Sequence, residues 1–347
     1  MGAGLVLSGP AAALPAQTLR FPRDHGSHPD FRTEWWYLTG RLEARAPARE
    51  FGFQLTFFRT RVATAQTVQS AFAARQLLAA HAAVTDLASG RLLHDQRLAR
   101  AGFGVAQADE DDTRIRLRDW SLVRQNGRYR AQVAGPDIDF TLEVSETQPL
   151  LLQGQDGLSR KGPEPRQASY YYSLPQLQVT GELQLQGRAH PVQGRAWLDH
   201  EWSQELLHPQ AVGWDWIGMN LQDGSALTAF QLRDRHGRAL WEGGSFRHPA
   251  MGAGARPYVF APGEVEFRAA RHWISPLTGA RYPVEWRIRT PADIYTVRAR
   301  LDNQELDSRA STGTVYWEGL AELVDSQGRP VGQGYLEMTG YVSPLRL

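Results

Sequence analysis

Short runs in which apolar and polar residues alternate dominate this sequence and limit what it can fold into. In residues 50–59, the apolar side chains Phe51, Phe53, Leu55 and Phe57 recur at every second position. A period of two is typical of half-buried antiparallel strands, whose side chains point alternately to the two faces of a sheet. Similar runs occupy residues 113–122, 132–144, 176–185, 226–233 and 293–301. The sequence therefore predicts an all-β protein.

Turn-forming residues separate these runs at regular intervals. They include Ser89-Gly90, Asn126-Gly127, Gln186-Gly187, Asp223-Gly224, His236-Gly237 and Gln327-Gly328. Many short strands joined by such turns favour a barrel or a sandwich. Residues 62–84 differ, because they are rich in Ala, Gln and Leu, which are good helix formers. We expect a short helix near residues 64–74.

The length of 347 residues fits about two domains. Residues 151–167 are polar and contain Gly and Pro, which predicts a long surface loop. This stretch contains Lys161, which is the only lysine in the sequence. We do not expect Lys161 to form a Schiff base. A domain boundary near residues 187–194 gives an N-terminal domain of residues 20–190 and a C-terminal domain of residues 191–347.

Residues 1–16, MGAGLVLSGPAAALPA, are small and apolar. They are typical of the second half of a secretory signal peptide, although a basic n-region is lacking. The alternative is a disordered Ala/Gly tail. We therefore set residues 1–19 apart as a signal-peptide remnant or tail and expect a periplasmic or secreted protein. No apolar run approaches the ~18 residues that span a bilayer, so we expect a protein that does not cross the membrane.

Composition and missing motifs exclude several functions. The 38 basic and 37 acidic residues balance, so nucleic-acid binding has no support. The chain has no cysteine and lacks phosphate-binding and dinucleotide-binding glycine motifs, so we expect no cofactor. His25 and His28 have a spacing that zinc sites use, but Gly26 and Pro29 mark a loop. We expect these histidines to cap turns and predict no metal.

Aromatic residues cluster with acids and histidines in five places. The clusters are residues 21–37, 169–173, 197–202, 213–216 and 316–319. Tryptophan in a barrel usually packs in the core, and a buried carboxylate usually needs an ionic partner. A purely structural interpretation of these clusters is thus that the aromatic residues pack in the core and the acids form ion pairs with arginine. The alternative is a ligand cavity on which the clusters converge.

Alternation along a strand separates the members of each cluster. Asp199 and Glu201 must point to one face of their strand, and His200 and Trp202 to the other. In the same way, Asp215 must point away from its neighbours Trp214 and Trp216. The sequence leaves open whether the acids or the His/Trp pair face the cavity.

Six blocks of sequence resemble a known family. They are FPRDHGSHPDFRTEWWYLTG, RQLLAAHAAVTD, YYYSLPQLQVTGEL, WLDHEWSQELL, GWDWIGMNLQDGSALTAFQLRD and VYWEGLAEL. Together they are similar to the secreted AttH-type branch of the carotenoid 1,2-hydratase (hydroxyneurosporene synthase) family. The resemblance implies two lipocalin-like antiparallel β-barrels packed side by side, as in several fungal pericyclases, and a strand at residues 76–85.

The resemblance also implies an activity. The family hydratase adds water across an isoprenoid double bond without a cofactor, which requires a carboxylic acid of raised pKa and aromatic faces to stabilise a carbocation. We therefore expect a cofactor-independent hydratase or lyase acting on an isoprenoid or other apolar lipid. Two alternatives are a non-catalytic lipocalin-type carrier of an apolar ligand in the cell envelope, with transporter components as partners, and a pericyclase-like template.

Candidate site residues follow from the clusters and the resemblance. The candidate catalytic residues are Asp199, His200, Trp202 and Asp215. The candidate substrate-binding residues are Glu34, Trp36, His81, Tyr171, Tyr172, Trp214, Trp216 and Tyr316. We expect eight of these residues to line or border a single polar and aromatic pocket, with His200 and Asp215 in reach of the same cavity. The eight are Glu34, Trp36, His81, Tyr171, His200, Trp202, Asp215 and Tyr316.

Overall fold

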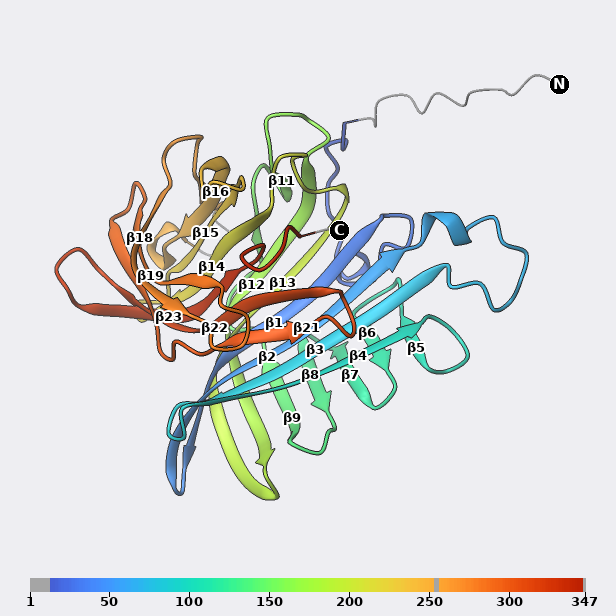
Figure 1. The fold of residues 1–347 in the computed structure, drawn as a ribbon, viewed down its shortest axis with the longest axis horizontal. Helices are drawn as coiled ribbons and strands as arrows, with labels where there is room; N and C mark the ends of the chain where they lie inside the picture. Colours follow the sequence, from blue (N-terminus) through green and yellow to red (C-terminus); the bar gives the residue numbers. More distant parts are fainter. Residues whose placement is uncertain (1–12, 253–255, 346–347) are drawn as a thin grey trace.

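The protein is built almost entirely from β-strands. The computed structural model describes residues 13–252 and 256–345. Strands contain 59% of the residues and helices 3%, and the strands form two antiparallel sheets (Figure 1). Three short 3-10 helices, η1 (Arg23–His25), η2 (Ala63–Ala65) and η3 (Pro249–Met251), supply the helical residues. The predicted all-β class is confirmed.

The first sheet has 13 strands. Its hydrogen-bonded order is β4 (Arg91–Arg100), β3 (Gln76–Asp86), β2 (Ala48–Arg61), β1 (Thr33–Arg45), β13 (Arg188–Glu205), β12 (Ala168–Leu185), β9 (Ile138–Ser145), β8 (Arg128–Val133), β7 (Trp120–Gln125), β6 (Arg114–Leu117) and β5 (Ala106–Ala108), with β10 (Leu151–Leu152) and β11 (Leu158–Arg160) also on β12. The sheet curls until β4 contacts β6, and it encloses the larger apolar core.

The second sheet has 10 strands and its own apolar core. Its order is β17 (Tyr258–Val259), β16 (Ala239–Arg247), β15 (Ala226–Arg233), β14 (Gly213–Leu221), β23 (Pro330–Met338), β22 (Thr314–Val324), β20 (Ile294–Ala299), β19 (Arg281–Arg289) and β18 (Glu266–Ile274), with β21 (Glu305–Ser308) on β22.

The two sheets pack side by side through their long central strands. The outer faces of β1, β12 and β13 contact β14 and β23 (Figure 1). A third apolar cluster, which includes Tyr37, Trp197, Trp216 and Tyr335, fills the space between them. The architecture is the lipocalin-like two-barrel fold that the resemblance implied.

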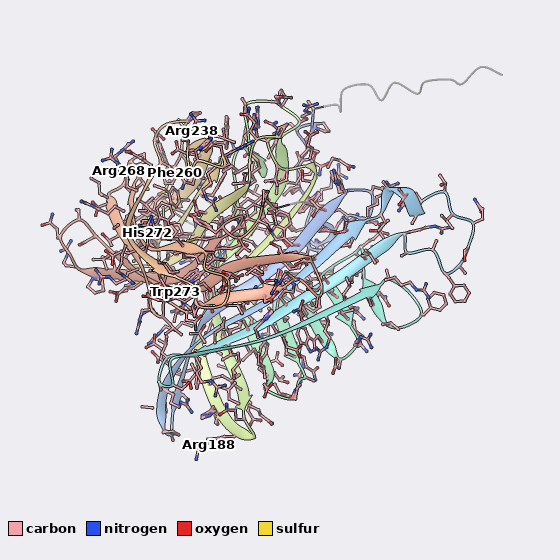
Figure 2. All side chains as sticks on the ribbon, viewed as in Figure 1. Arg188, Arg238, Phe260, Arg268, His272 and Trp273 are labelled. Carbon is pink, nitrogen blue, oxygen red and sulfur yellow. The ribbon has the colours of Figure 1, made fainter. Side chains whose placement is uncertain are left out.

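The change from one sheet to the other comes later in the chain than the boundary at residue 190. Strand β13 runs to Glu205 and lies between β1 and β12, so residues 191–205 belong to the first sheet. Gln186 and Gly187 both have positive φ and form the tight turn of the β12–β13 hairpin. Figure 2 shows Arg188 at the free tip of this hairpin, far from the second sheet. The Gly-containing stretch is therefore a hairpin turn, and the crossing to the second sheet lies between Glu205 and Gly213.

Two further expectations about local structure need correction. The helix expected at residues 64–74 is only η2, because this segment has no apolar face to bury: Phe72 is 71% exposed and Val68 is 42% exposed. The loop expected at residues 151–167 contributes β10 and β11, and its Lys161 is buried. The strand expected at residues 76–85 is confirmed as β3.

The predicted leader lies mostly outside the described residues, which begin at Ala13. Of its last residues, Leu14 packs against the first core and the carbonyl of Pro15 accepts a hydrogen bond from Tyr170. Among the described residues, none forms a helix with the length and apolar character needed to span a membrane.

Candidate functional site: a carboxyl-lined pocket between the sheets

The pleat of β13 divides the predicted site residues between two places. His200 and Trp202 point into the first barrel, where Trp202 joins the core. Asp199 and Glu201 point outward, toward the second sheet. The alternation expected from sequence is therefore present. It also means that the acids and the His/Trp pair cannot line the same cavity, because they are on opposite faces of one strand.

Inside the first barrel, Glu34 is the centre of a buried hydrogen-bond cluster. Its carboxylate accepts hydrogen bonds from Arg59 Nε at 2.6 Å, from His28 Nδ1 at 2.7 Å and from His200 Nε2 at 3.0 Å. Although burial by itself raises it, the hydrogen bonds from His200 and His28 hold the pKa of Glu34 well below its usual range. Glu34 is thus a carboxylate that neutralises the buried Arg59.

The histidines of this cluster have different charges. His28 lies between two carboxylates, with Nε2 3.1 Å from Asp24 Oδ1. Burial opposes its protonation, but the hydrogen bonds to Asp24 and Glu34 raise its pKa. Burial lowers the pKa of His200 to about 4, despite its bond to Glu34. The cluster therefore favours the charged form of His28 and the neutral form of His200.

Aromatic rings surround these histidines. His28 stacks on Trp202 with ring centres 3.7 Å apart, and Trp36 stacks on His200 at 4.5 Å. The hydroxyl of Tyr172 lies 2.8 Å from His25 Nδ1 and 3.2 Å from His200 Nδ1. Trp36, Trp202, Tyr172 and His200 are all at most 1% exposed. These predicted site residues thus form a packed structural core.

Ligand atoms of His28, Glu34 and His200 lie within 4.8 Å of one another, as in a metal site. The surroundings do not fit a cation. Both ring nitrogens of His28 are directed at carboxylate oxygens, and the Arg59 guanidinium already occupies Glu34 Oε2. We therefore assign the three residues to the hydrogen-bond cluster.

Asp215 lies inside the second barrel, away from His200. Its carboxylate accepts hydrogen bonds from Gln231 Nε2 at 2.8 Å, Arg233 Nε at 3.0 Å and the Tyr341 hydroxyl at 2.8 Å. The Arg233 guanidinium also stacks over the Tyr341 ring. The expectation that His200 and Asp215 share a cavity is wrong, because β14 directs Asp215 inward and its neighbours Trp214 and Trp216 outward.

His81 and Tyr316 meet between the sheets, beside the pocket. His81 Nδ1 lies 2.8 Å from the Tyr316 hydroxyl, and its Nε2 lies 2.9 Å from Ser311 Oγ. Burial lowers the pKa of His81 to about 3, so the ring is neutral. Gln54 donates to the Tyr316 hydroxyl and to Glu318, which connects this pair to the pocket wall.

The pocket itself lies between the two sheets and has a volume of about 90 Å³. Its lining combines aromatic and aliphatic side chains with four carboxyl groups and one ammonium group. The residues are Thr33, Trp35, Tyr37, Thr56, Phe58, Lys161, Asp199, Glu201, Leu206, Leu207, Trp214, Trp216, Phe230, Leu232, Glu318 and Glu337. Three of the residues predicted from sequence therefore line the pocket: Asp199, Trp214 and Trp216. Tyr171 does not line it but donates a hydrogen bond to Asp199.

Asp199 is held by three donors. Ser173 Oγ and Trp197 Nε1 donate to Oδ1 at 2.5 and 2.6 Å, and the Tyr171 hydroxyl donates to Oδ2 at 2.6 Å. Burial raises its pKa to about 7, although these donors act in the opposite direction. Because both oxygens are engaged, Asp199 is suited to fix the pocket wall and its electrostatics.

Glu318 and Glu337 are a pair of carboxyl groups on neighbouring strands. They are directly opposite each other in the register of β22 and β23. Burial raises the pKa of Glu337 to about 7, and burial together with the nearby Glu337 raises that of Glu318 well above its usual range. Oε1 of Glu318 has no hydrogen-bond partner among the described residues. The two carboxyl groups therefore keep their protons to higher pH than free carboxyl groups do, and both line the aromatic pocket.

Sequence reasoning overlooked most of this pocket. Glu318 was part of a noted aromatic cluster, but Glu337 has no aromatic neighbour in sequence except Tyr335. Strand register, which places Glu337 between Trp216 and Glu318, is what brings it to the site. Trp35 and Tyr37 alternate with the predicted Glu34 and Trp36, so choosing the other face of β1 would have found them.

Two sheets packed side by side around this cavity define a lipocalin-like two-barrel protein. The sequence pattern of the AttH-like family matches residues 12–341, and the chain belongs to that family. An AttH-type crystal structure from Nitrosomonas europaea is similar at 47% identity and a TM-score of 0.87, covering 96% of this chain and 100% of that one.

More distant structures share the fold. Kievitone hydratase from Nectria haematococca has 14% identity and a TM-score of 0.72, covering 94% of each chain. CghA has 11% identity and a TM-score of 0.53, covering 91% of this chain and 90% of its own. No curated protein sequence matches this chain.

Proposed function

We propose that this protein is a cofactor-independent hydratase or lyase that acts on an apolar small molecule in the pocket between the sheets. The observation that carries the proposal is the Glu318–Glu337 pair, whose buried carboxyl groups both have raised pKa values, that of Glu337 to about 7, in an aromatic cavity. A proton donor for a weakly basic alkene must remain protonated at working pH and must be shielded from water. Kievitone hydratase, which shares the fold, is by name a hydratase.

The proposed step is proton transfer from the Glu337 carboxyl group to one alkene carbon. A C–H bond forms, the π bond breaks and the other carbon becomes a carbocation, while Glu337 becomes a carboxylate. The faces of Trp35, Trp214 and Trp216 stabilise the positive charge. Water then adds to the cation and its proton returns to Glu337. The sum is alkene plus water giving an alcohol, and the reverse is dehydration.

We propose an isoprenoid or similar lipid as substrate, with carotenoid hydration as the narrowest version of this proposal. We also propose a periplasmic or secreted location, consistent with the leader-like N-terminal residues. N-terminal sequencing of exported full-length protein should then find a first residue near Gln17. A protein that keeps its full N-terminus after export would contradict this location signal.

A carrier without catalytic activity is the second candidate function. It is favoured by Asp199, whose carboxyl group accepts three hydrogen bonds from within the protein and is thereby fixed in the pocket wall. The two functions differ in one measurement. The purified protein is incubated with an isoprenoid lipid extract in heavy-oxygen water, and products are analysed by mass spectrometry. A hydratase yields lipids that have gained one labelled water, whereas a carrier returns its ligand unchanged.

A further inference from the structure

The ammonium group of Lys161 lies at one end of the pocket. Lys161 is 5% exposed and directly follows β11, which pairs with the edge of β12 opposite to β13. Its Nζ is 3.0 Å from Glu201 Oε1 and 3.1 Å from Ser159 Oγ. It also lies 4.3 Å from the ring centre of Phe230 and 4.7 Å from that of Tyr171. Two hydrogen-bond acceptors and two aromatic faces thus surround three N–H donors.

The residue type at this position is informative because the chain otherwise uses arginine. Lys161 is the only lysine among 38 basic residues. The remaining residues of the pocket include four acids and no other cation. A planar guanidinium carries five donors in a fixed fork, whereas an ammonium is a compact point charge with three rotatable donors. The small space between Phe230 and Tyr171 fits the second group.

The acid pair lies at the opposite end of the pocket. Tyr171, Asp199, Tyr37 and Thr56 are on consecutive strands β12, β13, β1 and β2. Three strand spacings of about 4.8 Å separate Tyr171 from Thr56, a span of about 14 Å. Gln54, on β2, donates to Glu318 at 2.7 Å. On the facing sheet, Phe230, Trp216, Glu337 and Glu318 are opposite one another on β15, β14, β23 and β22. Two to three strand spacings, about 10–14 Å, therefore separate the ammonium beside Phe230 from the two acids.

We infer that Lys161 binds an oxygen atom at the head of a short apolar ligand and thereby places the far end of that ligand at Glu318 and Glu337. The inference deepens the proposed function by naming the substrate class: an apolar chain with a hydroxyl, carbonyl or carboxyl oxygen at one end and a double bond near the other. Glu201 positions the ammonium, and Lys161 determines which end of the ligand enters each end of the pocket. The inference rests on this pocket as the ligand site but does not require turnover.

Binding of two probes with the same carbon skeleton tests the inference. Prenol (3-methylbut-2-en-1-ol) carries a terminal hydroxyl, and 2-methylbut-2-ene is the corresponding hydrocarbon, and both are small enough for the pocket. Binding is followed by quenching of tryptophan fluorescence, since Trp35, Trp214 and Trp216 line the pocket. A hydrogen bond to a charged group contributes about 1.5–3 kcal/mol, so we expect the protein to bind prenol about tenfold or more tightly than 2-methylbut-2-ene.

Lys161→Met alone leaves Glu201 as an unpaired buried carboxylate, so the decisive variant is the neutral pair Lys161→Met/Glu201→Gln. We expect it to bind both probes within about twofold of each other. Glu205→Gln, on the same strand and in a half-exposed pair with Arg166 outside the pocket, is the matched control and should keep the preference for prenol. Circular dichroism and melting temperature confirm that each variant is folded.

Several results would overturn the inference. They are equal binding of the two probes by the unmodified protein, no binding of either probe, or a preference that persists in the double variant. If the double variant misfolds, the test is the comparison of the two probes on the unmodified protein and on Glu205→Gln. If the protein prefers the hydroxyl probe but incorporates no labelled water, the inference about Lys161 stands and the proposed hydratase activity is wrong. The two claims can therefore be tested separately.

Discussion

At the scale of single residues, the two buried acid sites have opposite electrostatics. Glu34 is a permanent carboxylate because Arg59 and two histidines surround it. Glu337 lies among aromatic rings beside three other acids, with no arginine in the pocket lining. The first arrangement stabilises structure, and the second keeps a proton available. The residues of the two sites accordingly predict different mutant phenotypes.

Replacing Glu34 should reduce stability more than ligand binding. Glu34→Gln leaves the Arg59 guanidinium buried without a counter-charge, which costs about 3–5 kcal/mol for a broken buried pair. Chemical denaturation should show this loss, while binding of an apolar probe in the folded variant stays within about twofold. Glu43→Gln, on the same strand and in a half-exposed pair with Arg41, is the control and should cost less than about 1 kcal/mol. Equal effects of both changes would contradict the assigned role of Glu34.

Glu337 should make stability decrease as pH rises. Its pKa is raised to about 7 in the folded protein, so between about pH 4.5 and 7 the folded state holds a proton that the unfolded state has released. The stabilisation that Glu337 contributes is fully present below about pH 4.5 and is lost as the pH increases through about 7. The melting-temperature difference between Glu337→Gln and the unmodified protein should therefore shift in favour of the variant over this range. A pH-independent difference would show that Glu337 titrates normally.

At the scale of strands, alternation predicted the fold and the opposed faces of β13 correctly. It could not predict which face meets the second sheet, because both faces of β1, β12 and β13 are buried. Asp199 and Glu201 thus looked equivalent to His200 and Trp202. Glu337 reaches the pocket only through its register with Trp216 and Glu318, and the pairing of β23 with β14 joins segments far apart in the sequence, which local alternation does not specify.

The helix expected at residues 64–74 failed for a related reason. Propensity favours it, but the tertiary structure offers this segment no apolar surface to cover, and short helices without such packing are marginal. The resemblance to the family compensated at β3, where composition alone favoured helix. Family similarity thus contributed long-range information that composition and periodicity lack.

Close approach of β14 to the first sheet depends on Gly218. A Cβ atom there would lie 2.4 Å from the Trp216 ring and 3.1 Å from the Trp197 ring. Gly218→Ala should therefore displace one of these indoles and cost about 1–3 kcal/mol by overpacking. We expect a lower denaturation midpoint together with a changed tryptophan emission spectrum of the folded protein. An unchanged midpoint and spectrum would show that the sheets adjust freely at this point.

At the scale of the whole molecule, the two barrels share a buried interface and should unfold together. The cluster between them includes Tyr37, Trp197, Trp216 and Tyr335, each at most 7% exposed. Unfolding one barrel would expose these side chains on the other. Calorimetry should therefore show one transition with equal calorimetric and van't Hoff enthalpies. Two separated transitions would indicate barrels that are stable on their own and a pocket formed by loose docking.

The pocket belongs to neither barrel alone, since Asp199 and Lys161 come from the first sheet and Glu318 and Glu337 from the second. The central claim is that this shared pocket carries out proton-driven addition of water, with Glu337 as the donor. The most direct test measures incorporation of heavy-oxygen water into lipid by Glu337→Gln and by Glu322→Gln, a change on β22 outside the pocket. General acid catalysis typically contributes about 10²–10⁴-fold, so we expect Glu337→Gln to lose at least about 100-fold in rate while Glu322→Gln keeps the rate of the unmodified protein. Full activity of Glu337→Gln would contradict the account.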